Sequence, residues 1–239
     1  MSDTQDTDRS EAATPYKLQK ARERGQSPRS ADMVSSVVFM VAMLYLAAQG
    51  LRLTESLLQV VQATLVQAAQ VGPQGLWSLV ARATEETLVV LLPFLLLLPL
   101  AAVLGAMAQT GFVFSVHPLQ MDFQRLNPAV GFQRLFAMRT LFDAFRACAK
   151  LLVLGAVAFL ALQVVLPQFH ALSAMPAATF LHTAAGDLSG LGLKMALALL
   201  VVSLLDMAFT RHEFGRKMRM SRRELKDEYK NREGDPRIR

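Results

Sequence analysis

Residues 88–109 read LVVLLPFLLLLPLAAVLGAMAQ, and they belong to a longer stretch, residues 87–121, that contains no Asp, Glu, Lys or Arg. Residues 34–50 and 151–186 are also free of charge. The core of a soluble domain does not need uncharged runs of this length, whereas a helix that crosses a bilayer needs about 20 mostly apolar residues. These runs therefore predict a protein that is embedded in a membrane.

The predicted fold is all-α, with four long hydrophobic helices arranged in two hairpins. The predicted spans cover residues 34–51, 88–109, 149–167 and 188–209. Pro93 and Pro99 should bend the second span, because a proline removes a hydrogen bond inside a helix. Residues 53–80 predict an amphipathic segment on the outer side, which ends at Gly72 and Pro73.

Basic residues alternate between the segments that connect the spans. Residues 14–33 carry five Lys or Arg, whereas residues 52–87 carry two against three acids. Residues 111–148 carry four, residues 168–187 carry none, and residues 210–239 carry 11 of the 25 in the chain. Because cytoplasmic loops of membrane proteins are enriched in Lys and Arg, both termini and the loop 111–148 are predicted to be cytoplasmic.

The segment TPYKLQKARERGQSPRSADM, residues 14–33, carries start and stop signals of a short helix. Thr14 is a good N-cap and Pro15 suits the first helical position. Gly25 is a predicted C-terminal stop, and Ser30 is a predicted cap of the first span. Basic residues alone are enough to orient a membrane protein, and they do not require helix start and stop residues. We therefore expect a defined cytoplasmic helix here.

The loop 111–148 is rich in phenylalanine although it is predicted to be cytoplasmic. Asn127 and Pro128 resemble an N-cap and a first-turn proline. The apolar side chains that this loop offers to a surface are Leu126, Phe132, Leu135, Phe136, Phe142 and Phe145. Two interfacial helices on the inner leaflet and a surface that packs on partner subunits both predict this pattern.

Three ionisable residues lie within or beside the fourth predicted span, where a charge is costly. Lys194 either extends its ammonium group to the outer interface or pairs with Asp187, which lies seven residues earlier on a similar helix face. Asp206 lies near the cytoplasmic end, where an ion pair with Arg211 is the favoured interpretation.

The sequence predicts no enzyme, metal site or cofactor. The four histidines lack a second ligand at metal-site spacing, and no Ser or Cys has a credible base nearby. The single cysteine, Cys148, excludes an intramolecular disulfide. The basic flanks favour anionic lipid or an acidic partner, and nucleic acid is disfavoured because no aromatic platform accompanies the charge.

The tail continues the fourth span with a basic cluster, Arg211 to Arg223. Ser221 and Glu224 have the spacing of a capping box. Gly234 and Pro236 then predict the end of this helix.

Three stretches of the chain resemble one family. TPYKLQKARERGQSPRS resembles the T-P-x-K-L-x-x-A-R-E-K-G-Q-x-x-x-S opening of the bacterial flagellar and type III secretion export-switch proteins of the FlhB/SctU type. RLNPAVGFQRLFAMRTL is similar to their loop motif, and MSRRELKDEYKNREGDPRIR is similar to their linker, in a form closer to flagellar members. The N-terminal matches include Thr14, Pro15, Lys17, Leu18, Arg22, Gly25 and Gln26, and the linker matches include Arg222, Arg223, Glu224, Glu233, Gly234, Asp235 and Pro236.

This resemblance implies a structural and regulatory subunit at the cytoplasmic entrance of a protein export gate in the bacterial inner membrane. The implied partners are small gate subunits (FliP, FliQ and FliR-like, or SctR, SctS and SctT-like), the large gate subunit, secreted proteins and anionic lipid. The resemblance also implies a C-terminal domain that cleaves itself at Asn-Pro-Thr-His and switches substrate class. Asn127 and Pro128 are followed by Ala129 and Val130, so the membrane part alone is expected here.

Two other functions fit parts of the sequence. A small transporter or channel would use Lys194, Asp187 and Asp206 as a polar pathway, although the spans lack a midplane polar cluster. A membrane adaptor would need only the basic flanks. The predicted organisation comprises a disordered segment 1–13, a basic helix 14–33, a hairpin 34–110, a loop 111–148, a hairpin 149–209 and a linker helix 210–239.

Overall fold

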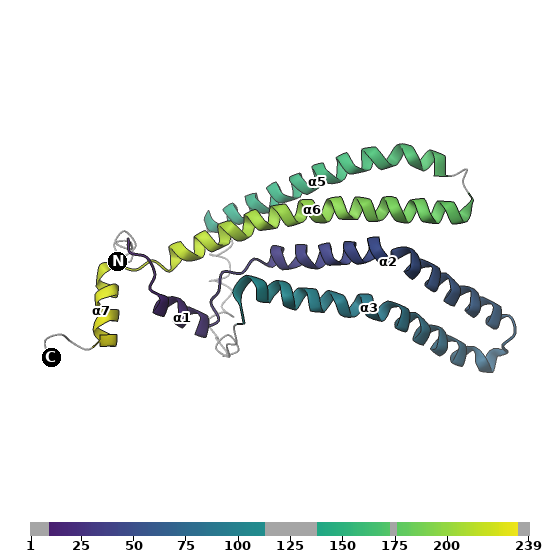
Figure 1. Ribbon diagram of the computed structural model, residues 1–239, viewed down its shortest axis with the longest axis horizontal. Coiled ribbons are helices and arrows are strands. Elements are labelled where there is room, and N and C mark those ends of the chain that lie inside the picture. Colours follow the sequence, from purple (N-terminus) through teal and green to yellow (C-terminus); the bar gives the residue numbers. More distant parts are fainter. Residues whose placement is uncertain (1–9, 113–137, 173–175, 234–239) are drawn as a thin grey trace. The chain divides into compact units, whose positions relative to one another are not determined.

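A computed structural model describes residues 10–112, 138–172 and 176–233 of the 239-residue chain. Within them, six α-helices and no strand are present, as the all-α prediction requires (Figure 1). The helices are α1 (Pro15–Glu23), α2 (Ala31–Ala68), α3 (Leu76–Thr110), α5 (Met138–Leu172), α6 (Ala177–Lys217) and α7 (Arg222–Glu233), and a short 3-10 helix, η1 (Pro73–Gly75), precedes α3.

The chain divides into two compact units. The long-helix unit comprises Ala31–Gly105 and Phe132–Leu204. The terminal unit comprises Met1–Ser30, Ala106–Gly131 and Leu205–Arg239. The N-terminal and C-terminal regions of the sequence therefore belong to the same unit.

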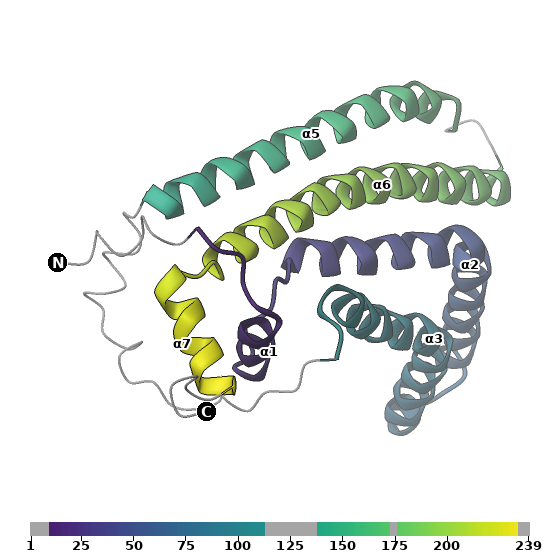
Figure 2. The ribbon, with the colours of Figure 1, turned by 60° about the vertical axis from the view of Figure 1, so that its left-hand side comes forward.

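Within the long-helix unit, α6 lies between α5 and α2, and α2 lies between α6 and α3 (Figures 1 and 2). Small residues allow α2 to approach its neighbours closely. A Cβ atom added to Gly105 of α3 would stand 3.3 Å from Cγ1 of Val37, and one added to Gly192 of α6 would overlap Met43. Ala42 and Ala196 are buried in the same unit. Close packing through small residues is typical of helices that associate in a membrane.

Two buried serines join α2 to α6. Ser36 and Ser203 are 0% and 1% exposed, and their Oγ atoms are 2.6 Å apart. Each hydroxyl group also contacts a carbonyl oxygen of its own helix at 2.9 Å, Ser36 that of Met33 and Ser203 that of Leu200. The two hydroxyls thus satisfy each other in an apolar interface, where an unpaired polar group is costly.

Three helices among the described residues are long and apolar enough to cross a membrane. They are Ala31–Ala68, Leu76–Thr110 and Thr179–Lys217, with mean hydropathies of 1.9, 2.8 and 2.1. The apolar stretch described within α5, Ala147–Gln163, is shorter. Three of the predicted spans are therefore matched by suitable helices, whereas a crossing by α5 stays a prediction.

The helices do not follow the predicted segments one by one. The predicted first span, 34–51, and the first part of the predicted amphipathic segment, 53–80, belong to a single helix, because α2 continues without a break to Ala68. Arg52 and Glu55 interrupt the apolar run, but both are ordinary helix formers and do not interrupt the helix. α3 contains Pro93 and Pro99, and both α2 and α3 change direction along their length (Figure 2).

Candidate functional site

Helix α1 has the caps that its sequence predicts. The hydroxyl oxygen of Thr14 accepts a hydrogen bond from the backbone N–H of Lys17 at 3.2 Å, and Pro15 occupies the first turn. Gly25 has a φ of 75°. The N–H of Gln26 donates to the carbonyl oxygen of Ala21 at 2.9 Å. This is the Schellman arrangement, and Gly25 suits it because a side chain would be strained at that φ.

Helix α7 also has its predicted cap. The hydroxyl oxygen of Ser221 accepts a hydrogen bond from the N–H of Glu224 at 3.2 Å. Immediately before this cap, Met220 and Glu11 form an isolated antiparallel bridge, with N–O distances of 3.1 and 3.0 Å. Met220 is also buried, with an exposed fraction of 3%. The chain before α1 and the chain before α7 are therefore joined by their backbones.

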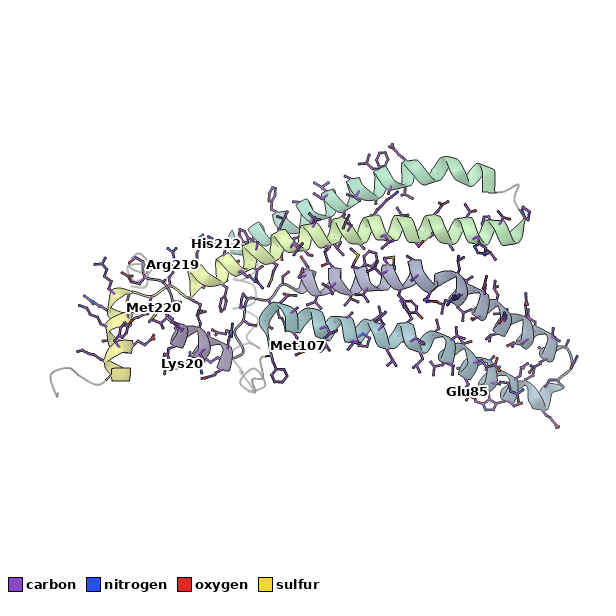
Figure 3. The ribbon with its side chains drawn as sticks, in the orientation of Figure 1. Lys20, Glu85, Met107, His212, Arg219 and Met220 are labelled. Atoms are coloured by element: carbon purple, nitrogen blue, oxygen red, sulfur yellow. The ribbon has the colours of Figure 1, made fainter. Side chains whose placement is uncertain are left out.

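Side chains extend this junction along α1 and α7. The hydroxyl group of Thr14 donates to Oε1 of Glu228 at 2.5 Å, and Nζ of Lys17 lies 3.2 Å from Oε2 of Glu224. Nε of Arg222 lies 3.2 Å from Oε1 of Glu11. We call these three interactions, together with the Glu11–Met220 bridge, the α1–α7 contact. Figure 3 shows α1 and α7 with Lys20, Arg219 and Met220 labelled near them.

The hydroxyl group of Thr14 has two functions in this contact. It accepts the capping hydrogen bond of α1 and donates to a carboxylate on α7. The two ion pairs involve partly exposed side chains, with exposed fractions of 30% and 43% for Lys17 and Glu224. Exposed ion pairs contribute about 0 to 1 kcal/mol each, so Thr14 and the backbone bridge carry most of the specificity.

A second polar cluster in the terminal unit surrounds Gln109, at the end of α3. The backbone N–H of Ser30 donates to Oε1 of Gln109 at 3.0 Å, and the Ser30 hydroxyl donates to Oδ2 of Asp206 at 2.7 Å. Arg211 donates from Nη2 to the carbonyl oxygen of Gln109 at 3.4 Å. Gly111 follows with a φ of 71°, which ends α3. Ser30 directly precedes α2 and bonds to Asp206 of α6, and its role as the cap of the first span stays a prediction.

Among the described residues, no contact joins Asp187, Lys194 and Asp206 into the predicted polar pathway. Asp187 and Lys194 both lie in α6, but no ion pair joins them there, and Lys194 is exposed. Oδ2 of Asp187 is buried without a hydrogen-bond partner among those residues. Asp206 belongs to the terminal unit, where it bonds to Ser30 of the same unit, whereas Asp187 and Lys194 belong to the long-helix unit. The transporter interpretation therefore gains no support from these contacts.

Much of the predicted partner-binding loop lies outside the described residues, and so do three linker residues. Those residues are Leu126, Asn127, Pro128, Phe132, Leu135, Phe136, Gly234, Asp235 and Pro236. Phe142 lies in α5, and Glu233 is the last residue of α7. Phe145 is 74% exposed on α5, which is unfavourable in water. Of the remaining motif residues, Leu18, Arg22 and Arg223 are exposed.

Sequence reasoning missed several residues that make these contacts. The sequence places Glu11 in a predicted disordered segment and Gln109 at the end of a predicted span. Asp32 of α2 forms an unpredicted ion pair with Lys150 of α5. A polar residue beside an apolar run was the available signal for Gln109 and Asp32, but it does not identify the partner.

The described contacts of the terminal unit are hydrogen bonds and ion pairs between the helices and the segments beside them. No group of three His, Cys, Asp or Glu side chains that could hold a metal is present within the described ranges. The contacts instead tie the start of the chain to its tail.

Comparisons with known proteins agree with the motifs. The model of the FlhB HrpN YscU SpaS family matches residues 7–239. The flagellar biosynthetic protein FlhB of Aquifex aeolicus is 34% identical over 235 residues, which are 96% of this chain and 65% of that protein. FlhB of Escherichia coli strain K12 is 32% identical over 241 residues, or 100% of this chain and 63% of that protein.

A third relative is the probable translocation protein y4yO of Sinorhizobium fredii, which is 35% identical over 249 residues, covering 100% of this chain and 69% of that protein. The chain thus spans about 65% of the length of the FlhB protein from Aquifex aeolicus. Because the family model covers nearly the whole sequence and the N-terminal, loop and linker motifs occur in their expected order, the chain belongs to the FlhB HrpN YscU SpaS family.

Proposed function

We propose that this chain is a structural and regulatory component of a flagellar or type III protein export gate, embedded in the bacterial inner membrane. The names of the relatives indicate the process, flagellar biosynthesis. The observation on this chain that most supports the proposal is the α1–α7 contact. Two family motifs from opposite ends of the sequence meet there. A transporter that acted alone would have no need of this junction.

In the proposed topology the chain crosses the membrane four times and both termini are cytoplasmic. The distribution of basic residues supports this orientation. α2 contains 38 residues and is therefore about 57 Å long, at about 1.5 Å per residue, whereas the hydrocarbon core of a bilayer is about 30 Å thick. We therefore expect α2 to extend beyond the lipid or to be covered by partner subunits.

The proposed partners are the small membrane subunits of the gate, its large subunit and the secreted proteins. Leu151, Leu152 and Phe159 of α5 are 61 to 74% exposed, and such a face needs lipid or a partner helix to cover it. We assign the loop 111–148 to the entrance of the gate. Anionic lipid is proposed to bind the basic flanks, and the switching of substrate class is proposed for the whole protein.

A scrambled N-terminal helix tests the role of the α1–α7 contact in export. Permuting residues 16–24 keeps their composition and charge, but it moves the lysine away from position 17. We expect normal membrane insertion and orientation, measured with reporter fusions at each loop, together with loss of secreted protein in the medium. Full secretion by this variant would contradict the proposed role.

A second experiment tests the proposed loop. Deleting residues 123–146 should leave the membrane helices inserted, but it should abolish secretion and weaken co-purification of the small gate subunits. An unaltered gate with normal secretion would remove the loop from the proposal. Purified chain that alone moves solutes across vesicles would instead favour the transporter interpretation.

A further inference from the structure

A groove separates α2 and α3 near the connection between them. It has a volume of about 710 Å³ and is lined by small and polar side chains of α2, including Gln59, and by a charged face of α3. Arg82, Glu85 and Glu86 supply the charges, and Val89 and Val90 follow them along α3. Figure 3 shows Glu85 on the part of α3 that is next to the connection. The volume lies within the range of about 300–1,000 Å³ typical of ligand sites.

The charged groups in this groove lack protein partners. Glu85 and Glu86 follow Arg82 by three and four residues, a spacing that places them on one helix face. Even so, no ion pair or hydrogen bond involves the side chain of any of the three within the part of the chain that the structure describes. One cationic and two anionic groups thus remain available to a ligand on the same face.

The groove lies where the apolar part of the hairpin gives way to its charged part. Glu86 is the last charged residue before the uncharged run 87–121, and Val89 and Val90 lie inside that run. On α2, Gln59 follows Arg52, the first charge after the uncharged run 34–50. In a bilayer this position corresponds to the headgroup region, which adds roughly 5–8 Å to each side of the hydrocarbon core.

We propose that this groove binds an aminophospholipid of the phosphatidylethanolamine type. The phosphate group would bind the guanidinium group of Arg82, which matches phosphate geometry. The primary ammonium group would donate hydrogen bonds to the carboxylates of Glu85 and Glu86. The glycerol and upper acyl chains would lie against Val89 and Val90.

The charges disfavour other lipid classes. An anionic headgroup would meet two carboxylates and only one guanidinium group, so repulsion opposes it. A choline headgroup keeps the positive charge but has no N–H group to donate to Glu85 and Glu86. The groove therefore differs from the basic flanks of the chain, which suit anionic lipid. This proposal rests on the membrane placement of the chain and not on its role in export.

Native mass spectrometry of the purified full chain in detergent tests the proposal. The chain is titrated with phosphatidylethanolamine, phosphatidylcholine and phosphatidylglycerol that have identical acyl chains. We expect the first molecule of phosphatidylethanolamine that binds to the chain to do so at least about tenfold more tightly than the first molecule of either other lipid. The double variant Glu85→Gln and Glu86→Gln should lose this preference, since charge-assisted hydrogen bonds of this kind are worth about tenfold or more. Equal binding of the three lipids would overturn the proposal.

Matched controls are available on the neighbouring helix. Glu55 and Arg52 are exposed on α2 and do not line the groove. Glu55→Gln should leave the preference unchanged, and so should Arg52→Gln, whereas Arg82→Gln should reduce it. Circular dichroism checks that each variant keeps its helix content. Loss of the preference in the control variants would show that net charge, and not this groove, selects the lipid.

Two further arms identify the ligand. Millimolar phosphoethanolamine, which has the headgroup without acyl chains, should fail to displace the lipid, and complete displacement would assign the groove to a soluble ligand. Cells that carry Glu85→Gln and Glu86→Gln should retain co-purification of the gate subunits. If those subunits are lost while lipid retention is unchanged, a partner helix occupies the groove and the proposal is wrong. Lipid retention is measured on the chain alone, so its failure leaves the proposed export role intact.

Discussion

Replacing Thr14 by alanine should loosen both α1 and α7, although the two helices are separated by most of the sequence. The Thr14 hydroxyl group accepts the capping hydrogen bond from Lys17 and donates to Glu228 at 2.5 Å. Alanine removes both interactions without adding bulk. The effect on α1 should therefore be larger than that of an ordinary cap deletion, and α7 should respond as well.

The expected magnitudes follow from these two hydrogen bonds. Loss of a threonine N-cap costs about 1 kcal/mol. The hydrogen bond to Glu228 is half-buried, so water partly replaces it, and its loss should cost about 1 kcal/mol more. Because about 1.4 kcal/mol is a factor of ten, α1 should open about 30-fold more often. α7 loses only the second interaction and should open about fivefold more often.

Hydrogen–deuterium exchange with mass spectrometry on the purified full chain measures both effects. Peptides that cover residues 16–24 and 222–232 report on α1 and α7 separately. The matched control is Thr14→Ser, which keeps the hydroxyl group and should change exchange by less than about threefold. Glu228→Gln is a second control, because it keeps an acceptor for Thr14 while it removes the charge.

The exchange rate of α7 in the Thr14→Ala variant decides whether Thr14 couples the two helices. If Thr14→Ala accelerates exchange in α1 but leaves α7 unchanged, Thr14 only caps its own helix and the side-chain part of the α1–α7 contact has no energetic role. Equal acceleration in both helices would instead indicate that they open as a single unit, with a shared cost of about 2 kcal/mol.

Two predictions concern the long-helix unit. Gly105→Leu should lower the thermal unfolding midpoint in detergent, because a Cβ atom there would stand only 3.3 Å from Cγ1 of Val37 and overpacking typically costs about 1–3 kcal/mol. The control Gly155→Leu should leave the midpoint unchanged, because a Cβ atom at Gly155 would have no other atom within 4 Å. Exchanging the charges of Asp32 and Lys150 should restore most of the stability that either single reversal loses. A double-mutant cycle should give a coupling of about 0.2–1 kcal/mol, and zero coupling would contradict the pairing.

Local chemistry was the most predictable part of this structure. Thr14, Gly25 and Ser221 were identified as helix ends from residue type and spacing, and each occupies the predicted position. Such signals depend only on backbone groups within a few residues. The sequence therefore contains the information needed to find them.

The lengths of the helices were less predictable from hydropathy. An uncharged run reports which residues tolerate lipid, whereas a helix continues wherever its residues favour it. Residues 52–68 contain Gln, Leu, Val and Ala, and they extend α2 beyond the apolar run. α6 likewise continues past residue 209 to Lys217, into the basic cluster that was predicted to continue the fourth span.

The contacts within the candidate site could not be predicted from this single sequence. Thr14 and Glu228 are 214 residues apart, and Ser30 and Asp206 are 176 apart. Many exposed Lys, Glu and Ser side chains could form such pairs, and neither charge nor periodicity chooses among them. The order of the motifs indicated a family, but their spatial meeting came only from the structure.

The two units are held by different forces, and this difference bears on the proposed function. Buried glycine, alanine and serine contacts hold the long-helix unit, and salt has little access to them. Exposed or partly exposed ion pairs, the hydrogen bond from Thr14 to Glu228 and a two-residue backbone bridge hold the α1–α7 contact. At an ionic strength of about 0.15 M, charges are screened beyond about 8 Å, and higher salt weakens exposed pairs further. The α1–α7 contact is therefore the weaker junction, and under the proposed function a regulatory motion would open it before the long helices separate.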